Sequence, residues 1–348
     1  MSMPDATAPI SVAVIHPRRP ALASWLLRLA IVLTVLAVVG YGFGAVLVYG
    51  EVSRSADFPT ADGRPRFGTV TPANLRFEIG GAAHDFSRYE MTDFAEVRFA
   101  SRDPGIEIAA WYVPSSQGAG APAVILVHGL RASRHDPSVL VPAGMLHAHG
   151  FAVLLIDLRD HGDSTWEDGR YAGGMEEQAD VLGARDWLVG QGVSAERIGL
   201  FGTSMGAGAV LIAAAVDSSI AAVWEDSSYA DTEQRIAEEL DRRGLPTILA
   251  PSAPFVARIL AGDDLSTWSP LKAVATFDGT ALYLTHGADD HATDVHHAHD
   301  LYAAAVAAGV DVELWIAPVV GHVRAYLDLT GEYESRLSAF FEQHLGRR

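Results

Sequence analysis

The chain has 348 residues, of which 49% are hydrophobic and 20% charged, so it can bury a sizeable core and is not disordered as a whole. It has 43 acidic side chains against 25 Lys and Arg, a net charge of −18, and such an acidic surface repels phosphate backbones. We therefore expect no nucleic-acid partner. Cysteine is absent, which excludes disulfide scaffolds, thiol nucleophiles and Cys-ligated metal centres.

A long apolar segment follows an N-terminal tail of residues 1–28. Residues 29–49 carry no charge, and as a helix they would extend roughly 31 Å, close to the thickness of a bilayer's hydrocarbon core. Trp25 and Tyr49 lie near its ends, where aromatic side chains favour the membrane interface. The segment predicts an uncleaved signal anchor that crosses the membrane once. The alternatives are a cleaved signal peptide and a buried core helix.

The charges nearest to this segment favour a cytoplasmic N-terminus. Arg28 precedes the span and Glu51 follows it, so we expect the rest of the chain to lie outside the cytoplasm, held at the cell membrane. Gly40 and Gly44 have the G-x-x-x-G spacing that can pack two membrane helices together. A homodimer through the span is therefore a further hypothesis.

Residues 50–94 hold several Pro and Gly between short apolar runs, which predicts a tether and a peripheral segment. From residue 95 to 348, short apolar runs alternate with helical patterns and predict one α/β domain with a mostly parallel sheet and helices on both faces. The reactive groups of such a domain lie on loops at the carboxyl ends of the strands. The expected strands are 96–100, 107–113, 123–127, 152–157, 198–201, 220–224, 281–285 and 312–316, and the expected helices include 175–190, 295–309 and 333–345.

The loop after residues 198–201 contains Gly202-Thr203-Ser204-Met205-Gly206, a G-x-S-x-G sequence that is followed by an Ala-rich helix. A sharp turn between strand and helix can lift a serine hydroxyl off the sheet, with glycines where a β-carbon would clash. Ser204 is therefore the candidate nucleophile.

Two later loops offer an acid and a base. Asp290 follows the strand expected at 281–285, and His322 follows the last expected strand. The chain order Ser204, Asp290, His322 is typical of a triad in which the acid orients the histidine and the histidine activates the serine. Other carboxylates could replace the acid, namely the adjacent Asp289 and, after the strand expected at 220–224, Glu225 and Asp226.

Two further loops surround this constellation. The sequence Leu126-Val127-His128-Gly129-Leu130 ends another expected strand, and the backbone amide of Leu130 could join that of Met205 to hold an oxyanion. We interpret His128 as a packing and hydrogen-bonding residue. Residues 157–164, Asp-Leu-Arg-Asp-His-Gly-Asp-Ser, are interpreted as mainly structural.

Taken together, five motifs over residues 95–348 resemble the α/β-hydrolase superfamily, in the branch of serine hydrolases similar to dienelactone hydrolases and serine aminopeptidases. They are LVHGL, D-x-R-x-H-G-x-S at 157–164, G-x-S-M-G, H-G-x-x-D at 286–290 and G-H at 321–322. The resemblance implies Ser204 as nucleophile, Asp290 as acid and His322 as base, with no cofactor. Dienelactone hydrolases use a cysteine nucleophile, which this chain lacks, so their specific chemistry is not transferred.

Residues 227–279 form an insertion after the sixth expected strand, and they predict a small helical cap. Apolar side chains between Leu245 and Leu260 predict that Phe255 and Ile259 line the substrate pocket; the alternative is that these helices simply pack against the sheet. A later stretch contains His291, His296, His297 and His299. We interpret these histidines as residues of a solvent-exposed helix start. His296 and His299 have a spacing compatible with a metal, but no metal site is predicted.

The resulting hypothesis is a membrane-anchored serine hydrolase that cleaves esters or thioesters of a small-molecule or acylated substrate through an acyl-enzyme. An aminopeptidase or amidase with the same triad is the nearest alternative. A non-catalytic binding protein on a hydrolase scaffold is the alternative from another functional class.

Overall fold

The computed structural model describes residues 22–55, 70–118, 120–263, 265 and 267–346. Most of the expected tail, and residues 56–69 of the expected tether, lie outside the described residues. The chain forms two compact units, residues 1–44 and 45–348.

The described part of the first unit belongs to helix α1 (Leu22–Ser53), which ends within the second unit. Among the described residues, this is the one helix long and apolar enough to cross a membrane, with a mean hydropathy of 2.5 within Ser24–Ser53. The helix is longer than the expected 29–49 segment because no proline interrupts residues 21–58.

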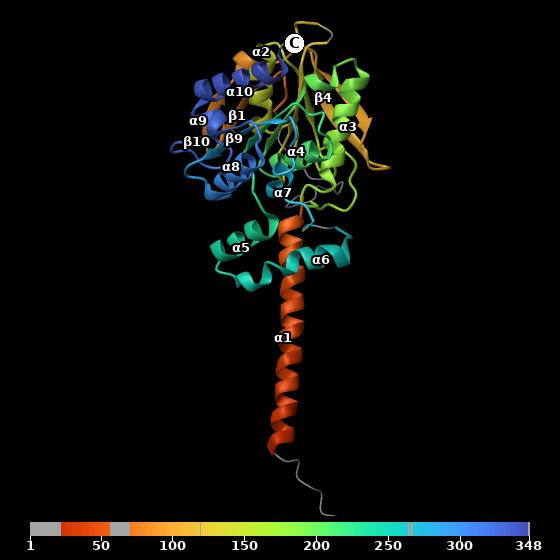
Figure 1. Cartoon of the computed structure of the whole chain (residues 1–348), viewed down its shortest axis with the longest axis vertical. Coiled ribbons are helices and arrows are strands. Elements are labelled where there is room, and N and C mark those ends of the chain that lie inside the picture. The colour runs from red at the N-terminus through yellow and green to blue at the C-terminus, as the bar shows by residue number, and fades with distance from the viewer. Residues whose placement is uncertain (1–21, 56–69, 119, 264, 266, 347–348) are drawn as a thin grey trace, which may run out of the picture. The chain divides into compact units, whose positions relative to one another are not determined.

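The second unit is built on an eight-stranded sheet with the order β10-β9-β8-β7-β5-β6-β4-β3. Helices surround this sheet (Figure 1). The pairs from β10 to β6 are parallel, whereas β4 pairs antiparallel with both β6 and β3. Strands β1 (Arg76–Ile79) and β2 (Ala82–Asp85) form a separate antiparallel hairpin. The sheet consists of β3 (Ala95–Ala100), β4 (Glu107–Val113), β5 (Ala123–Val127), β6 (Ala152–Ile156), β7 (Ile198–Thr203), β8 (Ala222–Asp226), β9 (Ala281–Gly287) and β10 (Val312–Ala317).

Alternate side chains of the strands contribute to two cores, one on each face of the sheet. In β5, Val124 and Leu126 belong to one core, while Ala123, Ile125 and Val127 belong to the other. The first core is covered by α2 (Pro137–Ala148), α9 (Ala325–Asp328) and α10 (Thr330–Leu345). The second is covered by α3 (Glu177–Gly190), α4 (Met205–Val216), α7 (Pro270–Val274) and α8 (His296–Ala308). The expected α/β architecture is confirmed.

Element boundaries differ from the expected ones where local turns intervene. Strand β8 begins two residues later than expected because the N–H of Ile220 donates to Asp217 O, at 3.2 Å, and keeps that residue in the turn after α4. In the part of the chain that the structure describes, short 3-10 helices connect larger elements: η1 (Ser87–Tyr89), η2 (Ala195–Arg197) and η3 (Thr247–Leu249).

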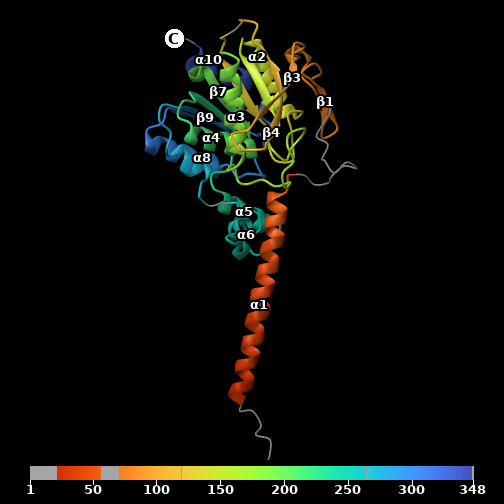
Figure 2. The ribbon, with the colours of Figure 1, turned by 90° about the vertical axis from the view of Figure 1, so that its right-hand side faces the viewer.

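A small helical cap follows β8, the sixth strand of the main sheet in chain order, as expected. It contains α5 (Thr232–Arg242), η3 and α6 (Ser252–Leu260), which lie away from the sheet layers in two views (Figures 1 and 2). The cap is shorter than the expected 227–279 segment, since α7 packs against α4 and α8 and so belongs to a layer that covers the sheet.

The last turns of α1 belong to the second unit and pack against the cap. Ala45 and Tyr49 are buried against residues in the middle of α6 and after it, and Val48 is buried against α5 and the start of α6. The Tyr49 hydroxyl donates to Asp263, at 3.1 Å. The sequence pattern predicts residues 45–49 as part of a membrane span, whereas in the structure they pack against other parts of the same chain. The partners are Val256, Ala257 and Leu265 on one side and Ile236, Leu240, Ala250 and Ala253 on the other.

Candidate active site

Ser204 lies at a sharp turn between β7 and α4, with a φ of 52°. This region of backbone space is unfavourable for a residue with a β-carbon, and strain of this kind is characteristic of the turn that presents a nucleophilic serine. The N–H of Ser204 donates to Asp226 O, at 2.8 Å, and fixes the turn to the neighbouring strand. A β-carbon at Gly206 would overlap the carbonyl oxygen of His128, and one at Gly202 would lie 2.5 Å from Gly206 O. Both glycines are therefore required by close backbone contacts.

The structure brings Ser204, Asp290 and His322 together from three separate loops. His322 Nε2 is 3.0 Å from Ser204 Oγ, and His322 Nδ1 is 2.7 Å from Asp290 Oδ2. The Asp290 side chain is fully buried, whereas that of His322 is 27% exposed. A histidine so placed can accept the serine proton on one ring nitrogen while the carboxylate holds the other.

Asp290 is kept ionised by its surroundings. Its Oδ1 accepts the backbone N–H groups of Ala292 and Thr293 at 2.8 and 2.9 Å. Burial alone raises the pKa of Asp290, but hydrogen bonds from His286 and His322 outweigh burial and hold this pKa well below its ordinary value. His286 was not singled out from the sequence, although it is the first residue of the H-G-x-x-D motif. Its Nε2 lies 3.3 Å from Asp290 Oδ2.

The other candidate acids have different surroundings. Asp289 is exposed, and its backbone N–H donates to Val320 O. Glu225 accepts the N–H of Ser228 at 2.8 Å, and Asp226 accepts hydroxyl groups of Ser227 and Tyr333, each at 2.9 Å. Of the four carboxylates, Asp290 is the one whose hydrogen bond to His322 the structure describes.

The backbone positions expected to hold an oxyanion lie beside the serine. Leu130 and Met205 line the same cavity as Ser204. Met205 is the first residue of α4, where a backbone N–H has no partner within the helix. A β-carbon at Gly129 would lie 3.4 Å from Ser204 Cβ, so the loop that carries Leu130 runs next to the serine.

The remaining polar motifs are structural, in agreement with the sequence interpretation. His128 is buried, its Nδ1 lies 2.8 Å from Gly129 O, and its Nε2 accepts the N–H of Leu158 at 3.2 Å. Burial lowers the pKa of His128 to about 4, so the ring is neutral. Asp157 is also buried and forms an ion pair with Arg134, whose backbone N–H it accepts at 2.7 Å.

A cavity of about 220 Å³ opens above Ser204 and His322. Part of its wall comes from residues that sequence reasoning did not assign to the site: Val52 at the end of α1, Ile236 on α5 and Tyr171 in the loop before α3. Ile236 and Leu240 are four residues apart on α5, and this spacing predicts that one apolar face of the cap points inward.

Phe255 and Ile259 are not brought to this cavity, which corrects the expectation for the substrate pocket. Their exposed fractions are 66% and 64%, and neither lines the cavity above Ser204. Helix α6 instead directs Val256 and Ala257 inward against the end of α1, so positions 255 and 259 lie on its outer side. When a helix that is apolar on both sides packs one side against another helix, its other apolar side stays exposed. Composition alone does not reveal which side that is.

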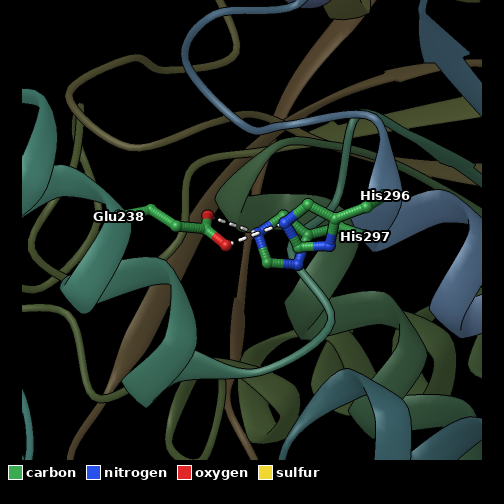
Figure 3. A group of neighbouring side chains, drawn as sticks. All are labelled: Glu238, His296 and His297. Atoms are coloured by element: carbon green, nitrogen blue, oxygen red, sulfur yellow. Dashed lines mark hydrogen bonds and ion pairs between the residues drawn. The ribbon is translucent and has the colours of Figure 1, made fainter.

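A group of titratable side chains links the cap to α8 (Figure 3). Glu238 on α5 lies 2.8 Å from Nε2 of His296 and 2.8 Å from Nε2 of His297. Nδ1 of His297 accepts the N–H of Ala230 at 3.2 Å, so the ring proton is on Nε2 and points to Glu238. A metal ion bound to Nε2 of His297 would require the ring proton to be on Nδ1. There it would face the N–H of Ala230, which is also a donor. We therefore interpret the group as a hydrogen-bonded link; His299 is not part of it.

Solved structures share this fold. An esterase of Pyrococcus furiosus aligns with a TM-score of 0.62 and 23% identity, covering 81% of this chain and 98% of that chain. An acylaminoacyl peptidase of Pyrococcus horikoshii aligns with a TM-score of 0.55 and 17% identity, covering 73% of this chain and 42% of the other. The sheet order and these likenesses show the α/β-hydrolase fold, as the motifs indicated.

The family follows from the sequence comparison. A profile of the prolyl oligopeptidase family matches residues 137–348. The chain belongs to this family and is a serine hydrolase of the α/β-hydrolase fold. An uncharacterised protein of Mycobacterium tuberculosis is 28% identical over 232 residues, which are 66% of this chain and 71% of that protein. An uncharacterised 31.7 kDa protein of Escherichia coli is 33% identical over 123 residues, 34% of this chain and 42% of that protein.

Proposed function

We propose that the chain is a membrane-anchored serine hydrolase that cleaves carboxylic esters or thioesters, with Ser204, His322 and Asp290 as its triad. The observation that carries the proposal is the pair of hydrogen bonds, 3.0 and 2.7 Å long, that joins these three side chains at the base of a cavity. The substrate is a small or acylated molecule that enters this cavity.

In the first half of the reaction, Ser204 Oγ attacks the acyl carbon while His322 Nε2 accepts its proton. Asp290 holds the Nδ1 proton and stabilises the imidazolium, and the N–H groups of Leu130 and Met205 stabilise the oxyanion. His322 then donates its proton to the departing alkoxide or thiolate. The product of this half is an ester between the acyl group and Ser204.

In the second half, His322 removes a proton from water, and the resulting nucleophile attacks the acyl-enzyme. The oxyanion is held by the same two backbone amides. When the intermediate collapses, Ser204 Oγ leaves and takes the proton back from His322. The acid is released, and every proton is carried by a side chain of the triad, so the proposed sequence of steps uses no cofactor.

A peptidase or amidase with the same triad is the second candidate, and the family to which the chain belongs favours it. An aminopeptidase needs an anionic group to hold the free amine of its substrate. Among the described residues, the carboxylates that line the cavity are Glu51 and Glu239, but Glu51 lies 3.2 Å from an Arg243 nitrogen and Glu239 lies 2.6 Å from another. Because arginine already pairs with both acids, the cavity supports an ester substrate better than a free α-amine.

The test compares p-nitrophenyl esters of several chain lengths with aminoacyl p-nitroanilides, using the full chain in detergent. We expect kcat/KM to be measurable for esters and to exceed that for every anilide, with both activities lost in Ser204→Ala. Amides are intrinsically harder to cleave. An aminoacyl anilide that is hydrolysed as fast as the best ester would therefore favour the peptidase.

We also propose that the protein is held at the cell membrane with its catalytic domain outside the cytoplasm. The length and hydropathy of α1 support the anchor. We expect the protein to stay in the membrane fraction after alkaline carbonate washing. We also expect added protease to digest the catalytic domain once the outer envelope is permeabilised. Release by carbonate would contradict the anchor, and full protection from protease would contradict the extracytoplasmic orientation. The homodimer through Gly40 and Gly44 is a further hypothesis, and crosslinking in membranes tests it.

A further inference from the structure

We propose that the outer surface of the cap is embedded in the interfacial region of the lipid bilayer. This cap surface consists of Leu245, Ile248, Phe255, Ile259 and Leu260, with Val46 and Leu47 on the last turns of α1. The proposal rests on the membrane anchor proposed above and goes beyond it, because it assigns a second, separate contact between the catalytic unit and lipid.

The first observation is the exposure of large apolar side chains on the cap. Ile248, Phe255 and Ile259 are 71%, 66% and 64% exposed. Leu245 and Leu260 are also exposed. Single exposed apolar residues are normal on a protein surface, but a group of them in one short segment indicates an interaction site.

The second observation is that both sides of α6 are apolar. Ala253, Val256 and Ala257 face inward and are buried, while Phe255 and Ile259, four residues apart, share the outer side. A helix of a water-soluble surface has a polar outer face. The outer face of α6 instead has the character of a helix that lies in the membrane interface.

The third observation is the charge of the segment. Residues 245–260 contain one ionisable side chain, Arg258, in a chain whose net charge is −18. Arg258 is exposed and lies on α6 between Phe255 and Ile259. Its long side chain can reach the headgroups while its neighbours enter the acyl region, and its positive charge is attracted to anionic lipids.

The contact between α1 and the cap selects lipid rather than another protein as the occupant. Ala45 and Tyr49 belong to the last turns of the apolar segment, and both are buried against residues of α6 or after it. Because these residues touch, α6 lies at the depth where the anchor leaves the hydrocarbon core. Val46 and Leu47 are exposed on the same turns, so apolar side chains of the anchor and of the cap occur in one compact unit.

The absence of cysteine makes a direct test possible, because one introduced cysteine can be labelled selectively. The full chain with Phe255→Cys is labelled with the polarity-sensitive dye NBD and reconstituted into vesicles of phosphatidylcholine and phosphatidylglycerol. We expect a blue-shifted emission, strong quenching by lipids that carry a doxyl group near the top of the acyl chain, and little quenching by aqueous iodide. Ile259→Cys should behave in the same way.

Val306→Cys is the matched control. Val306 is 53% exposed on α8 of the same unit, and its label should be quenched by iodide and not by doxyl lipid. A Phe255→Cys label that behaves like the Val306 label overturns the proposal. A label shielded from iodide but not quenched by lipid also overturns it and indicates a second copy of the chain on the cap.

The failure of this proposal is distinguishable from a failure of the proposed function. A label at Leu36→Cys reports the anchor alone: quenching at position 36 without quenching at position 255 overturns the cap contact and retains the anchor. Labelling of Ser204 by a fluorophosphonate reports catalysis in each variant. Cooperative thermal unfolding at the wild-type temperature checks that the exposed substitutions leave the fold intact.

Discussion

At the scale of single residues, Asp290 illustrates how the fold selects one carboxylate from several candidates. Asp289 is adjacent in sequence but exposed, whereas Asp290 is buried and holds His322 at 2.7 Å. Two backbone N–H groups hold Oδ1 of Asp290, and His286 Nε2 lies 3.3 Å from Oδ2. The side chain is therefore both oriented and ionised before a substrate arrives.

We expect Asp290→Asn to reduce kcat by several orders of magnitude, on the order of 10⁴ as in well-studied triads, because an amide cannot hold the histidine in the required tautomer. Asp289→Asn is the matched control and should retain most of the activity. Steady-state kinetics on the best p-nitrophenyl ester measures both. A larger loss in Asp289→Asn would assign the acid to that residue instead.

A second residue gives a prediction about pH and stability. Burial raises the pKa of Glu225 to about 8, and one of its carboxylate oxygens accepts the N–H of Ser228. Between its ordinary pKa and about pH 8, Glu225 is therefore protonated in the folded state and ionised in the unfolded state. Stability from this group is complete below the unfolded pKa and is lost as the pH rises through about 8.

We therefore expect Glu225→Gln, which keeps the acceptor but cannot ionise, to gain stability relative to the wild type as the pH rises. Urea unfolding of both proteins from about pH 5 to about pH 9 measures the difference. The contribution of titrating groups that do not interact with Glu225, such as Glu177, cancels in this comparison. A difference that does not change with pH would show that Glu225 is ionised in the folded protein.

At the scale of elements, the turn from β7 to α4 requires glycine for steric reasons. Gly206→Ala would place a β-carbon on the carbonyl oxygen of His128, and overpacking of this kind costs about 1–3 kcal/mol. Gly190→Ala at the end of α3 is the control, because its β-carbon would meet nothing within 4 Å. We expect the urea midpoint to fall in the first variant and to be unchanged or slightly raised in the second. Equal midpoints would contradict the proposed close contact.

Elements that carry a strong local pattern could be predicted from the sequence. The strands of the sheet and the loop that carries Ser204 are marked by apolar runs, glycines and motif order. The outward position of Phe255 could not be predicted, since it depends on α6 packing against the end of α1. The role of α7 was missed for a similar reason: its contacts with α4 and α8 join segments far apart in sequence.

At the scale of the whole molecule, the structure connects the apolar segment to the site. Val52 and the residues beside it line the cavity above Ser204, a few positions after the turns of α1 that pack on the cap. The second unit, which contains Ser204, therefore includes part of the helix that we propose as its anchor. Removal of the whole helix would delete part of the cavity wall, and activity measurements should use the full chain.

The central claim is that Ser204 is the activated nucleophile, and a fluorophosphonate probe tests it most directly. Ser53→Ala is the matched control, because Ser53 lines the same cavity but its hydroxyl donates to Tyr49 O, at 2.7 Å. We predict labelling of the wild type and of Ser53→Ala, and none of Ser204→Ala. Equal labelling of Ser204→Ala and the wild type would contradict the account.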